Sequence, residues 1–135
     1  MFPAQTRILV IDDMPSIRDL VKVQLRAMGF SSIVEAEDGE QGLKLMIQQN
    51  SFGQPFELVI SDWNMPRMSG LDLLKQVRAT AEWQALPFVM LTSESEREQV
   101  TEAILAGVSQ YLVKPFTGKI FEDKLKTVWA KHNKA

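Results

Sequence analysis

The stretch Ile8-Leu9-Val10-Ile11-Asp12-Asp13 joins four consecutive apolar residues to a pair of acidic residues. The apolar run does not alternate with polar residues, which indicates a strand buried on both faces, as in a parallel sheet covered by helices. The same arrangement recurs three more times. Each further apolar run ends in polar residues: Leu58-Val59-Ile60 in Ser61-Asp62, Phe88-Val89-Met90-Leu91 in Thr92-Ser93, and Tyr111-Leu112-Val113 in Lys114-Pro115. A weaker run, residues 32–36, is a candidate for one more strand.

Segments with helical periodicity separate these runs. Pro15 suits the first turn of the first helix, and the third helix is expected to be capped by Ser69. The fourth is expected to start at Ser95, where Glu98 completes a capping box, and the fifth near Thr117. Five strand–helix alternations predict right-handed βαβ units, and hence a doubly wound α/β sandwich with a five-stranded parallel sheet.

The composition is that of an ordinary globular chain, with 135 residues, 45% of them hydrophobic and 24% charged. This length predicts one domain, residues 1–135, with its core between about residues 6 and 130 and no output domain. No apolar run approaches the roughly 20 residues of a membrane span, and no signal-peptide pattern is present, so a cytoplasmic protein is expected. The absence of cysteine excludes disulfides, and a net charge of −2 gives no reason to expect nucleic acid as a partner.

The polar residues that end the four strong strands are expected to meet at one edge of the sheet, because ligands of open parallel sheets bind outside the carboxyl ends of the strands. Three carboxylates at this edge, those of Asp12, Asp13 and Asp62, would repel one another and require a compensating cation. With no cysteine in the chain, oxygen ligands favour Mg²⁺, or Mn²⁺, over zinc. Lys114 would add a fixed positive charge and Thr92 a hydroxyl donor.

A metal, a lysine and a hydroxyl around a carboxylate are the groups that stabilise a transferring phosphoryl group. The carboxylate can itself be the nucleophile and form an aspartyl phosphate, so Asp62 is the predicted phosphoryl acceptor. Taken singly, these residues have structural alternatives. Asp12-Asp13 could cap a helix beside Pro15, and Lys114 could be a solvated charge.

At these residues the chain resembles the receiver domains of two-component response regulators, and in particular stand-alone chemotaxis regulators of the CheY type. The resemblance covers nearly the whole chain and implies a flavodoxin-like fold. It rests on Asp12-Asp13, Asp62, Met65-Pro66 with Gly70, Thr92-Ser93 and Lys114-Pro115-Phe116.

The resemblance implies which residues would carry out the chemistry. Asp62 would accept the phosphoryl group from a histidine kinase in a Mg²⁺-dependent reaction. Asp13, Asp62 and the backbone carbonyl of Asn64 would ligate the metal, and Asp12 would do so through a water. The Lys114-Pro115 peptide is expected to be cis. The protein would be a signalling receiver and not an enzyme, catalysing only its own phosphoryl transfer and autodephosphorylation.

The resemblance also implies a switch. Thr92 and Lys114 would contact the phosphoryl oxygens, and Tyr111 would change rotamer as Thr92 moves. Asn64 and Glu94 would tune the rate of dephosphorylation. Trp63, beside the phosphoryl acceptor, is expected to lie partly exposed with no chemical role.

The sequence leaves the output of the signal open. The receiver would contact a downstream protein through its fourth helix, fifth strand and fifth helix, as a monomer or as a weak dimer on phosphorylation. A chemotaxis regulator that contacts the flagellar motor switch is favoured, and a phosphatase could act on it. A shuttle that passes phosphate to a histidine phosphotransfer protein is the alternative, because the acidic stretch Ser95-Glu96-Arg97-Glu98-Gln99 leaves the motor contact in question.

Two other protein classes fit part of the pattern. A Mg²⁺-dependent aspartyl phosphatase of the haloacid-dehalogenase type needs a second aspartate two positions after the nucleophile, where this chain has Asn64. A flavodoxin-like FMN carrier needs a Ser/Thr/Gly phosphate loop after the first strand, where Asp12 and Asp13 would repel the phosphate. Neither class is favoured.

Overall fold

The computed structural model describes residues 1–93 and 99–133, and strands and helices alternate along this chain. In chain order the elements are β1 (Ile8–Ile11), α1 (Pro15–Ala27), β2 (Ile33–Ala36), α2 (Gly39–Ser51), β3 (Leu58–Asp62), α3 (Gly70–Ala79), a short 3₁₀ helix η1 (Ala81–Trp83), β4 (Phe88–Thr92), α4 (Val100–Leu105), β5 (Gln110–Val113) and α5 (Gly118–His132).

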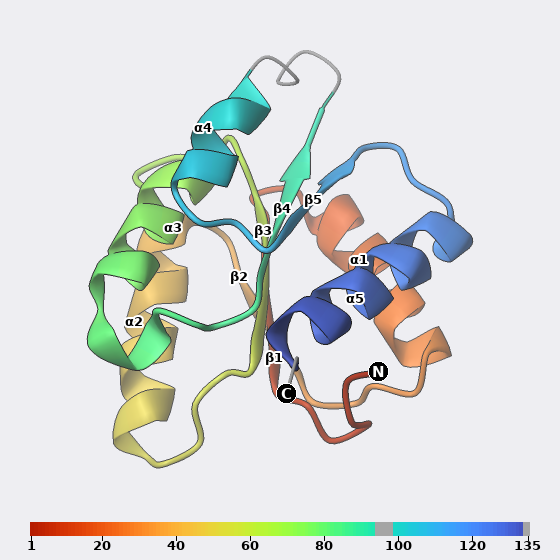
Figure 1. The fold of residues 1–135 in the computed structure, drawn as a ribbon, viewed down its shortest axis with the longest axis horizontal. Helices are drawn as coiled ribbons and strands as arrows, with labels where there is room; N and C mark the ends of the chain where they lie inside the picture. Colours follow the sequence, from red (N-terminus) through yellow and green to blue (C-terminus); the bar gives the residue numbers. More distant parts are fainter. Residues whose placement is uncertain (94–98, 134–135) are drawn as a thin grey trace.

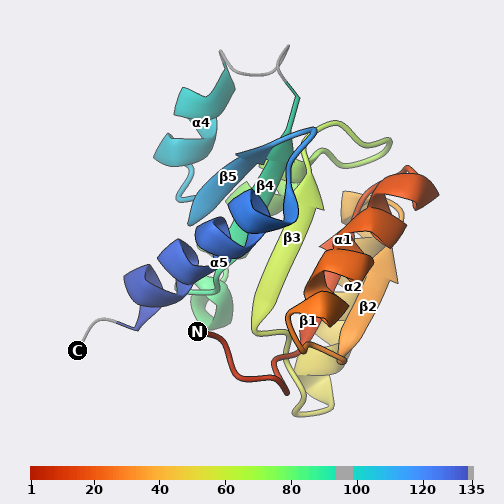
Figure 2. The ribbon, with the colours of Figure 1, turned by 90° about the vertical axis from the view of Figure 1, so that its right-hand side faces the viewer.

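The strands form one parallel sheet in the order β2-β1-β3-β4-β5. Helices α1 and α5 cover one face of the sheet, and α2, α3 and α4 lie on the other (Figures 1 and 2). The predicted doubly wound sandwich with five parallel strands is therefore confirmed. The strand order changes direction between β1 and β3, which makes the carboxyl ends of these two strands the expected place for a ligand.

The core divides into two hydrophobic clusters, one on each face of the sheet. Every residue of β1, β3 and β4 is buried, as expected for apolar runs that do not alternate with polar residues. The edge strands β2 and β5 are only partly buried. Phe2 packs edge-to-face on Trp129 of α5, with ring centroids 5.1 Å apart, and so ties the N-terminal segment to the core.

Two of the predicted helix starts are confirmed by side-chain caps. The hydroxyls of Ser69 and Thr117 accept hydrogen bonds from backbone N–H groups in the first turns of α3 and α5. Helix α4 is described from Val100 onward. The predicted start of that helix at Ser95, with its capping residue Glu98, lies outside the described residues.

The expectation that Trp63 is partly exposed is wrong. Its exposed fraction is 5%, and it belongs to the cluster beneath α2 and α3. The reason is that its backbone N–H donates to the carbonyl of Leu91 at 3.1 Å. The pairing between β3 and β4 thus continues one residue beyond Asp62, and the indole packs into the core.

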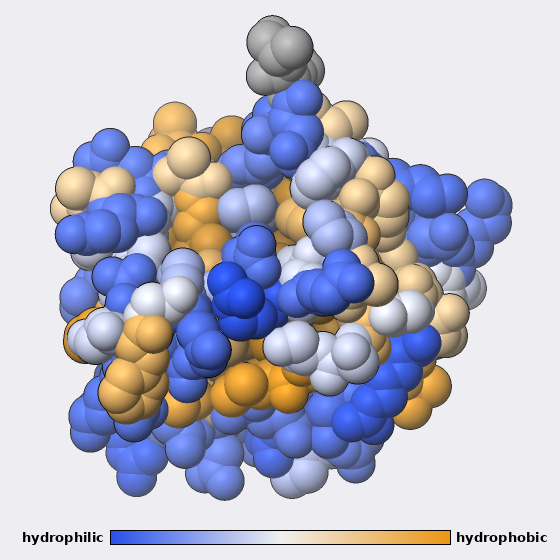
Figure 3. All heavy atoms as spheres, turned by 90° about the horizontal axis from the view of Figure 1, so that it is seen from below, coloured by the Kyte–Doolittle hydropathy of each residue, from blue (hydrophilic) through white to orange (hydrophobic). Residues whose placement is uncertain are grey.

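The surface at the amino ends of the strands is mainly polar. Figure 3 shows this side of the molecule, where hydrophilic side chains dominate and the apolar patches are separated from one another. Within residues 1–93 and 99–133, no helix combines the length and the apolar character needed to cross a membrane.

Candidate functional site

Four of the predicted site residues lie at the carboxyl ends of neighbouring strands. Asp12 directly follows β1, and Asp62 is the last residue of β3, which pairs with β1. Thr92 ends β4, the next strand in the sheet, and Lys114 follows β5. Because β1 and β3 flank the change in strand order, this edge is where open α/β sheets bind their ligands.

The carboxylates at this edge lie close enough together to share one cation. Oxygens of Asp12, Asp13 and Asp62 all lie within 4.8 Å of one another. Lys114 Nζ donates a hydrogen bond to Asp62 Oδ1 at 2.9 Å, and it lies 3.9 Å from Asp12 Oδ2. The structure therefore brings together the three acids and the lysine that the sequence analysis assigned to one edge.

Two oxygen atoms of the site are buried without a hydrogen-bond partner. Asp12 and Thr92 are fully buried, whereas Asp13 is exposed. Across the part of the chain that the structure describes, Asp12 Oδ2 and Thr92 Oγ1 are the buried side-chain oxygens that no hydrogen bond satisfies. A buried hydroxyl or carboxylate oxygen left in this state costs about 1–3 kcal/mol. Both atoms occur at the same edge, as expected where a ligand completes the hydrogen bonding.

Burial raises the pKa of Asp12 from 3.8 to about 6. The Met14 N–H, which donates to Asp12 Oδ1 at 2.9 Å, lowers this pKa, and the charge of Asp62 raises it. Two buried carboxylates thus compete for one lysine, and a divalent cation would relieve both the burial cost and the repulsion. Since all of the donors are oxygens, the residues present fit Mg²⁺ or Mn²⁺.

The alternative that Asp12 and Asp13 cap the first helix is wrong. The N-cap of α1 is Met14, which makes no side-chain capping hydrogen bond, while Pro15 lies in the first turn of α1 as predicted. The Asp12 carboxylate instead accepts from the N–H of Met14 within the loop. Neither acid is therefore accounted for by helix capping.

Gly70 allows α3 to begin directly against the end of β3. A Cβ atom at this position would overlap the carbonyl oxygen of Asp62. The Gly70 N–H donates to the carbonyl of Trp63 at 2.8 Å, which closes the loop between β3 and α3 at its base. Asn64, whose carbonyl is an expected metal ligand, is exposed within this loop.

Both residues of the expected switch, Thr92 and Tyr111, lie within the described part of the chain. Tyr111 is half-buried in β5, and Lys124 Nζ lies 4.9 Å from the centre of its ring. The expected cis peptide between Lys114 and Pro115 is confirmed. Glu94 lies outside the described residues.

Sequence reasoning missed three charged residues that support the loops of this edge. Arg18 Nη1 donates to the backbone carbonyl of Asp12 at 2.6 Å. Arg67 Nη1 donates to Asp38 Oδ2 at 2.7 Å across the β2–α2 and β3–α3 connections. Asp38 precedes Gln41 by three residues and could have been recognised as a helix cap, but the partners of the two arginines leave no local signal.

The chain matches a known family over most of its length. A family model described as "Response regulator receiver domain" matches residues 8–126. The chain is 39% identical, over 94% of its length and 98% of the relative's, to a protein of Pseudomonas aeruginosa named chemotaxis protein CheY. It is 43% identical to chemotaxis protein CheY-3 of Vibrio cholerae, with 91% of each chain covered.

A solved structure supports the same relationship. The chemotaxis response regulator CheY4 of Vibrio cholerae superposes with a TM-score of 0.79 at 32% identity, covering 92% of this chain and 98% of the other. Sequence and structure comparisons therefore agree with the relationship first indicated by the residues at the carboxyl edge.

Proposed function

Because this chain belongs to the response regulator receiver domain family, we propose that it is a regulator activated by phosphorylation of Asp62. Receiver domains of the CheY type are signalling proteins and not classical enzymes. The observation that carries the proposal is the pairing of Lys114 with Asp62 beside the unsatisfied oxygens of Asp12 and Thr92. This set of groups matches what phosphoryl transfer to a carboxylate requires.

The proposed donor is a phosphohistidine of a histidine kinase. A carboxylate oxygen of Asp62 attacks the phosphorus, the new P–O bond forms as the P–N bond breaks, and the imidazole leaves with the electron pair and takes up a proton. Lys114 offsets the negative charge on the phosphoryl oxygens, and the Thr92 hydroxyl donates to one of them. Hydrolysis of the acyl phosphate by water returns Asp62 to its starting state, at a rate tuned by Asn64 and Glu94.

The proposed metal ligands are Asp13, Asp62 and the backbone carbonyl of Asn64, with Asp12 acting through a water. When bound, Mg²⁺ (or Mn²⁺) neutralises the clustered carboxylates and the charge on the transferring group. Lys114 holds Asp62 in place from the side of β5, and the Met14 N–H orients Asp12.

The proposed output is contact with a downstream protein through α4, β5 and α5. Exposed Ile104 and Ile120 lie on the two helices, and half-buried Tyr111 lies on the strand as the expected switch residue. The chemotaxis names of the relatives support a role in chemotaxis. The target proposed for this role is the flagellar motor switch, and the proposed site of action is the cytoplasm. Under this proposal the protein acts as a monomer or a weak phosphorylation-dependent dimer and is reset by autodephosphorylation or a phosphatase.

Mass spectrometry of the intact protein tests the phosphorylation directly. Incubation with phosphoramidate and Mg²⁺ should add one phosphoryl group, and borohydride reduction followed by peptide mapping should locate it at Asp62. The Asp62→Asn variant should remain unmodified, while Asp72→Asn, at an exposed position of α3, should be modified like the wild type. Steady turnover of p-nitrophenyl phosphate by the wild type would favour the phosphatase alternative instead.

A pull-down with the beryllofluoride-treated protein as bait distinguishes the two outputs. Recovery of flagellar switch components by the treated but not the untreated protein supports chemotaxis. Recovery of a histidine phosphotransfer protein supports the phosphorelay. Asp62→Asn is the matched control, because it removes the carboxylate to which beryllofluoride binds.

A further inference from the structure

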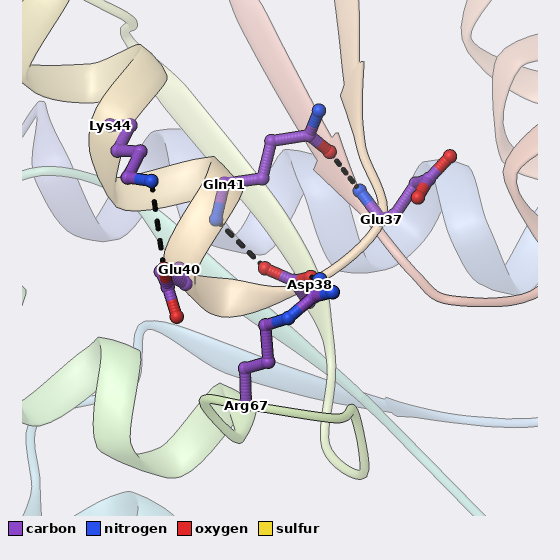
Figure 4. Close-up of a pocket in the computed structure, with 6 residues that line it drawn as sticks. All are labelled: Glu37, Asp38, Glu40, Gln41, Lys44 and Arg67. Atoms are coloured by element: carbon purple, nitrogen blue, oxygen red, sulfur yellow. Dashed lines mark hydrogen bonds and ion pairs between the residues drawn. The ribbon is translucent and has the colours of Figure 1, made fainter.

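An ion pair joins the loop that follows the phosphoacceptor to the start of α2. Arg67 Nη1 lies 2.7 Å from Asp38 Oδ2, and Figure 4 shows the arginine side chain extending from the β3–α3 loop to this carboxylate. The Asp38 side chain is 3% exposed, whereas that of Arg67 is 66% exposed. An exposed cation is thus fixed on a buried anion at the edge of a surface cavity.

Asp38 is held rigidly by its own helix. Its Oδ1 accepts from the N–H of Gln41 at 2.8 Å, and Gln41 Oε1 accepts from the N–H of Glu37 at 2.6 Å. The Gln41 N–H, and after it Arg67, holds the pKa of Asp38 below its usual value, so the carboxylate remains charged at neutral pH. The α2 end of the ion pair is therefore a fixed anchor.

A backbone hydrogen bond reinforces the same connection. The N–H of Gly39 donates to the carbonyl of Met68 at 3.2 Å. A Cβ atom at Gly39 would lie 2.6 Å from that oxygen, so the close approach of the two loops requires glycine. The β3–α3 loop is consequently held to α2 at two successive residues, Arg67 and Met68.

The backbone of Arg67 is unusual for an arginine. Its φ is 67°, in the left-handed region that glycine and asparagine adopt more readily, and it is the one non-glycine residue with positive φ in the described part of the chain. Asparagine or glycine would fit this turn with less strain, but neither could reach Asp38. The ion pair gives a physical reason for the arginine.

The loop between its two fixed points contains Asn64. Its base is closed by the hydrogen bond from the Gly70 N–H to the Trp63 carbonyl, and its tip is held by Arg67. Asn64 is adjacent to the base and three residues before the tip. Restraint at both ends limits the directions in which the Asn64 carbonyl can point.

We propose that the Arg67–Asp38 ion pair is a positioning clamp that aims the Asn64 carbonyl at the metal. This inference rests on the proposed function, because it takes Asn64 as a metal ligand. Arg67 touches neither the metal nor the phosphoryl group and is a positioning residue. Since the pair is largely exposed at the arginine, it adds little to overall stability, and its loss acts mainly on metal binding.

The direction in which Mg²⁺ affinity changes when Arg67 is replaced distinguishes a positioning clamp from a purely electrostatic effect. If Arg67 acts on the metal through Coulomb forces alone, removing its positive charge should strengthen Mg²⁺ binding or leave it unchanged. Removing a clamp should weaken it, because the carbonyl ligand loses its orientation. The two explanations therefore predict different changes in the Mg²⁺ dissociation constant of Arg67 variants.

The test is a Mg²⁺ titration of the metal-free protein followed by the amide NMR signals of Asp13 and Asn64. Arg67→Asn keeps a residue suited to the left-handed turn, and it should raise the dissociation constant about tenfold. Arg67→Lys should recover part of the affinity. Lys44→Ala removes another cation from the lining of the same cavity and should leave the constant unchanged or slightly lower.

Each outcome of the titration decides the proposal. An unchanged or lower dissociation constant in Arg67→Asn would overturn the clamp while leaving the proposed function standing, provided that Asp13→Ala still weakens Mg²⁺ binding. Failure of the wild type to bind Mg²⁺ would overturn both. The midpoint of urea unfolding should be nearly the same in Arg67→Asn and the wild type, and a loss of affinity explained by partial unfolding at the titration temperature would overturn the clamp.

Discussion

At the amino end of the sheet the buried hydroxyl of Ser109 has two partners, whereas at the carboxyl end the buried hydroxyl of Thr92 has none in the described part of the chain. Ser109 Oγ accepts from the N–H of Phe88 at 3.0 Å and is hydrogen-bonded to His132 Nε2 at 2.6 Å. Nearby, Arg78 donates to three backbone carbonyls. Among the described residues, these buried polar groups are thus hydrogen-bonded at one end of the sheet, whereas two buried oxygens at the other end are left without partners.

The difference separates the part of the molecule that stabilises the fold from the part that is proposed to bind the metal and the phosphoryl group. Satisfied buried polar groups contribute to stability, while unsatisfied ones cost about 1–3 kcal/mol each. The unsatisfied oxygens of Asp12 and Thr92 occur where a metal and a phosphoryl group are proposed to bind. Removing a satisfied polar group at the amino end should therefore lower the unfolding free energy of the metal-free protein. Removing an unsatisfied polar group at the carboxyl end should raise it.

The largest effect is expected from Arg78→Met at the amino end. The Arg78 guanidinium donates to the carbonyls of Gly107, Trp83 and Leu86 at 2.7–3.0 Å. Its removal leaves these acceptors without a charged donor and should lower the unfolding free energy by about 3–4 kcal/mol. Urea unfolding followed by circular dichroism measures the change.

Arg26→Met is the matched control, because Arg26 is exposed in the last turn of α1. This substitution should change the unfolding free energy by no more than about 0.5 kcal/mol. Equal effects of the two arginine substitutions would contradict a structural role of Arg78 in joining α3 to the loop before β5.

The next largest effect is expected from Asp12→Asn, with the opposite sign. Since burial raises the pKa of Asp12 from 3.8 to about 6, the folded state binds a proton more tightly than the unfolded state. Stability of the metal-free wild type should fall as pH rises from about 4 through about 6, and Asp12→Asn removes this loss. Above about pH 7 the variant should be more stable by about 2–3 kcal/mol.

Unfolding in EDTA at several pH values tests this prediction. The gain in Asp12→Asn should shrink as the pH is lowered and disappear below about pH 4. Saturating Mg²⁺ should reduce or reverse the gain, since a ligand that binds only the folded wild type stabilises it. A gain that is independent of pH would show that the charge of Asp12 is not its cause.

A pair of near-isosteric hydroxyl deletions compares the two ends directly. Thr92→Val removes a hydroxyl without a partner and should raise the unfolding free energy of the metal-free protein by about 1 kcal/mol. Ser109→Ala removes a hydroxyl with two partners and should lower it by about 1–2 kcal/mol. Changes of the same sign in the two variants would contradict the proposed difference between the ends.

The sequence predicted the parts of this molecule that repeat a simple rule. Unbroken apolar runs identified the central strands β1, β3 and β4 to within two residues, because a strand buried on both faces has no polar position to obscure it. Ligands of open parallel sheets bind outside the carboxyl ends of the strands, and this rule predicted that Asp12, Asp62 and the other strand-end residues lie together. Both the fold and the site thus follow from strand patterns and topology.

The features missed by the sequence depend on tertiary geometry. The sequence predicts a partly exposed Trp63, because a local pattern does not reveal that β3–β4 pairing continues past Asp62. The partner of Arg67 lies 29 residues away in another loop. The missing partner of the Thr92 hydroxyl depends on the positions of all its neighbours, which the sequence does not specify.

The smallest effect is expected from the single histidine, His132. The pH dependence of stability that it causes should have the opposite sign to that caused by Asp12. Burial, together with the charges of Arg78 and Lys131, lowers the pKa of His132 below 6.5, although the Ala85 carbonyl opposes this. Below pH 6.5 the unfolded state takes up the proton before the folded state, so protonation of His132 should lower the free energy of unfolding on acidification. Protonation of Asp12 has the opposite effect on this free energy.

The NMR titration of the His132 ring should give a pKa below 6.5, and the stability of His132→Gln relative to the wild type should rise as the pH is lowered toward about 5. A relative stability that falls on acidification would mean that the folded protein stabilises protonated His132, which contradicts the expected lowering of its pKa.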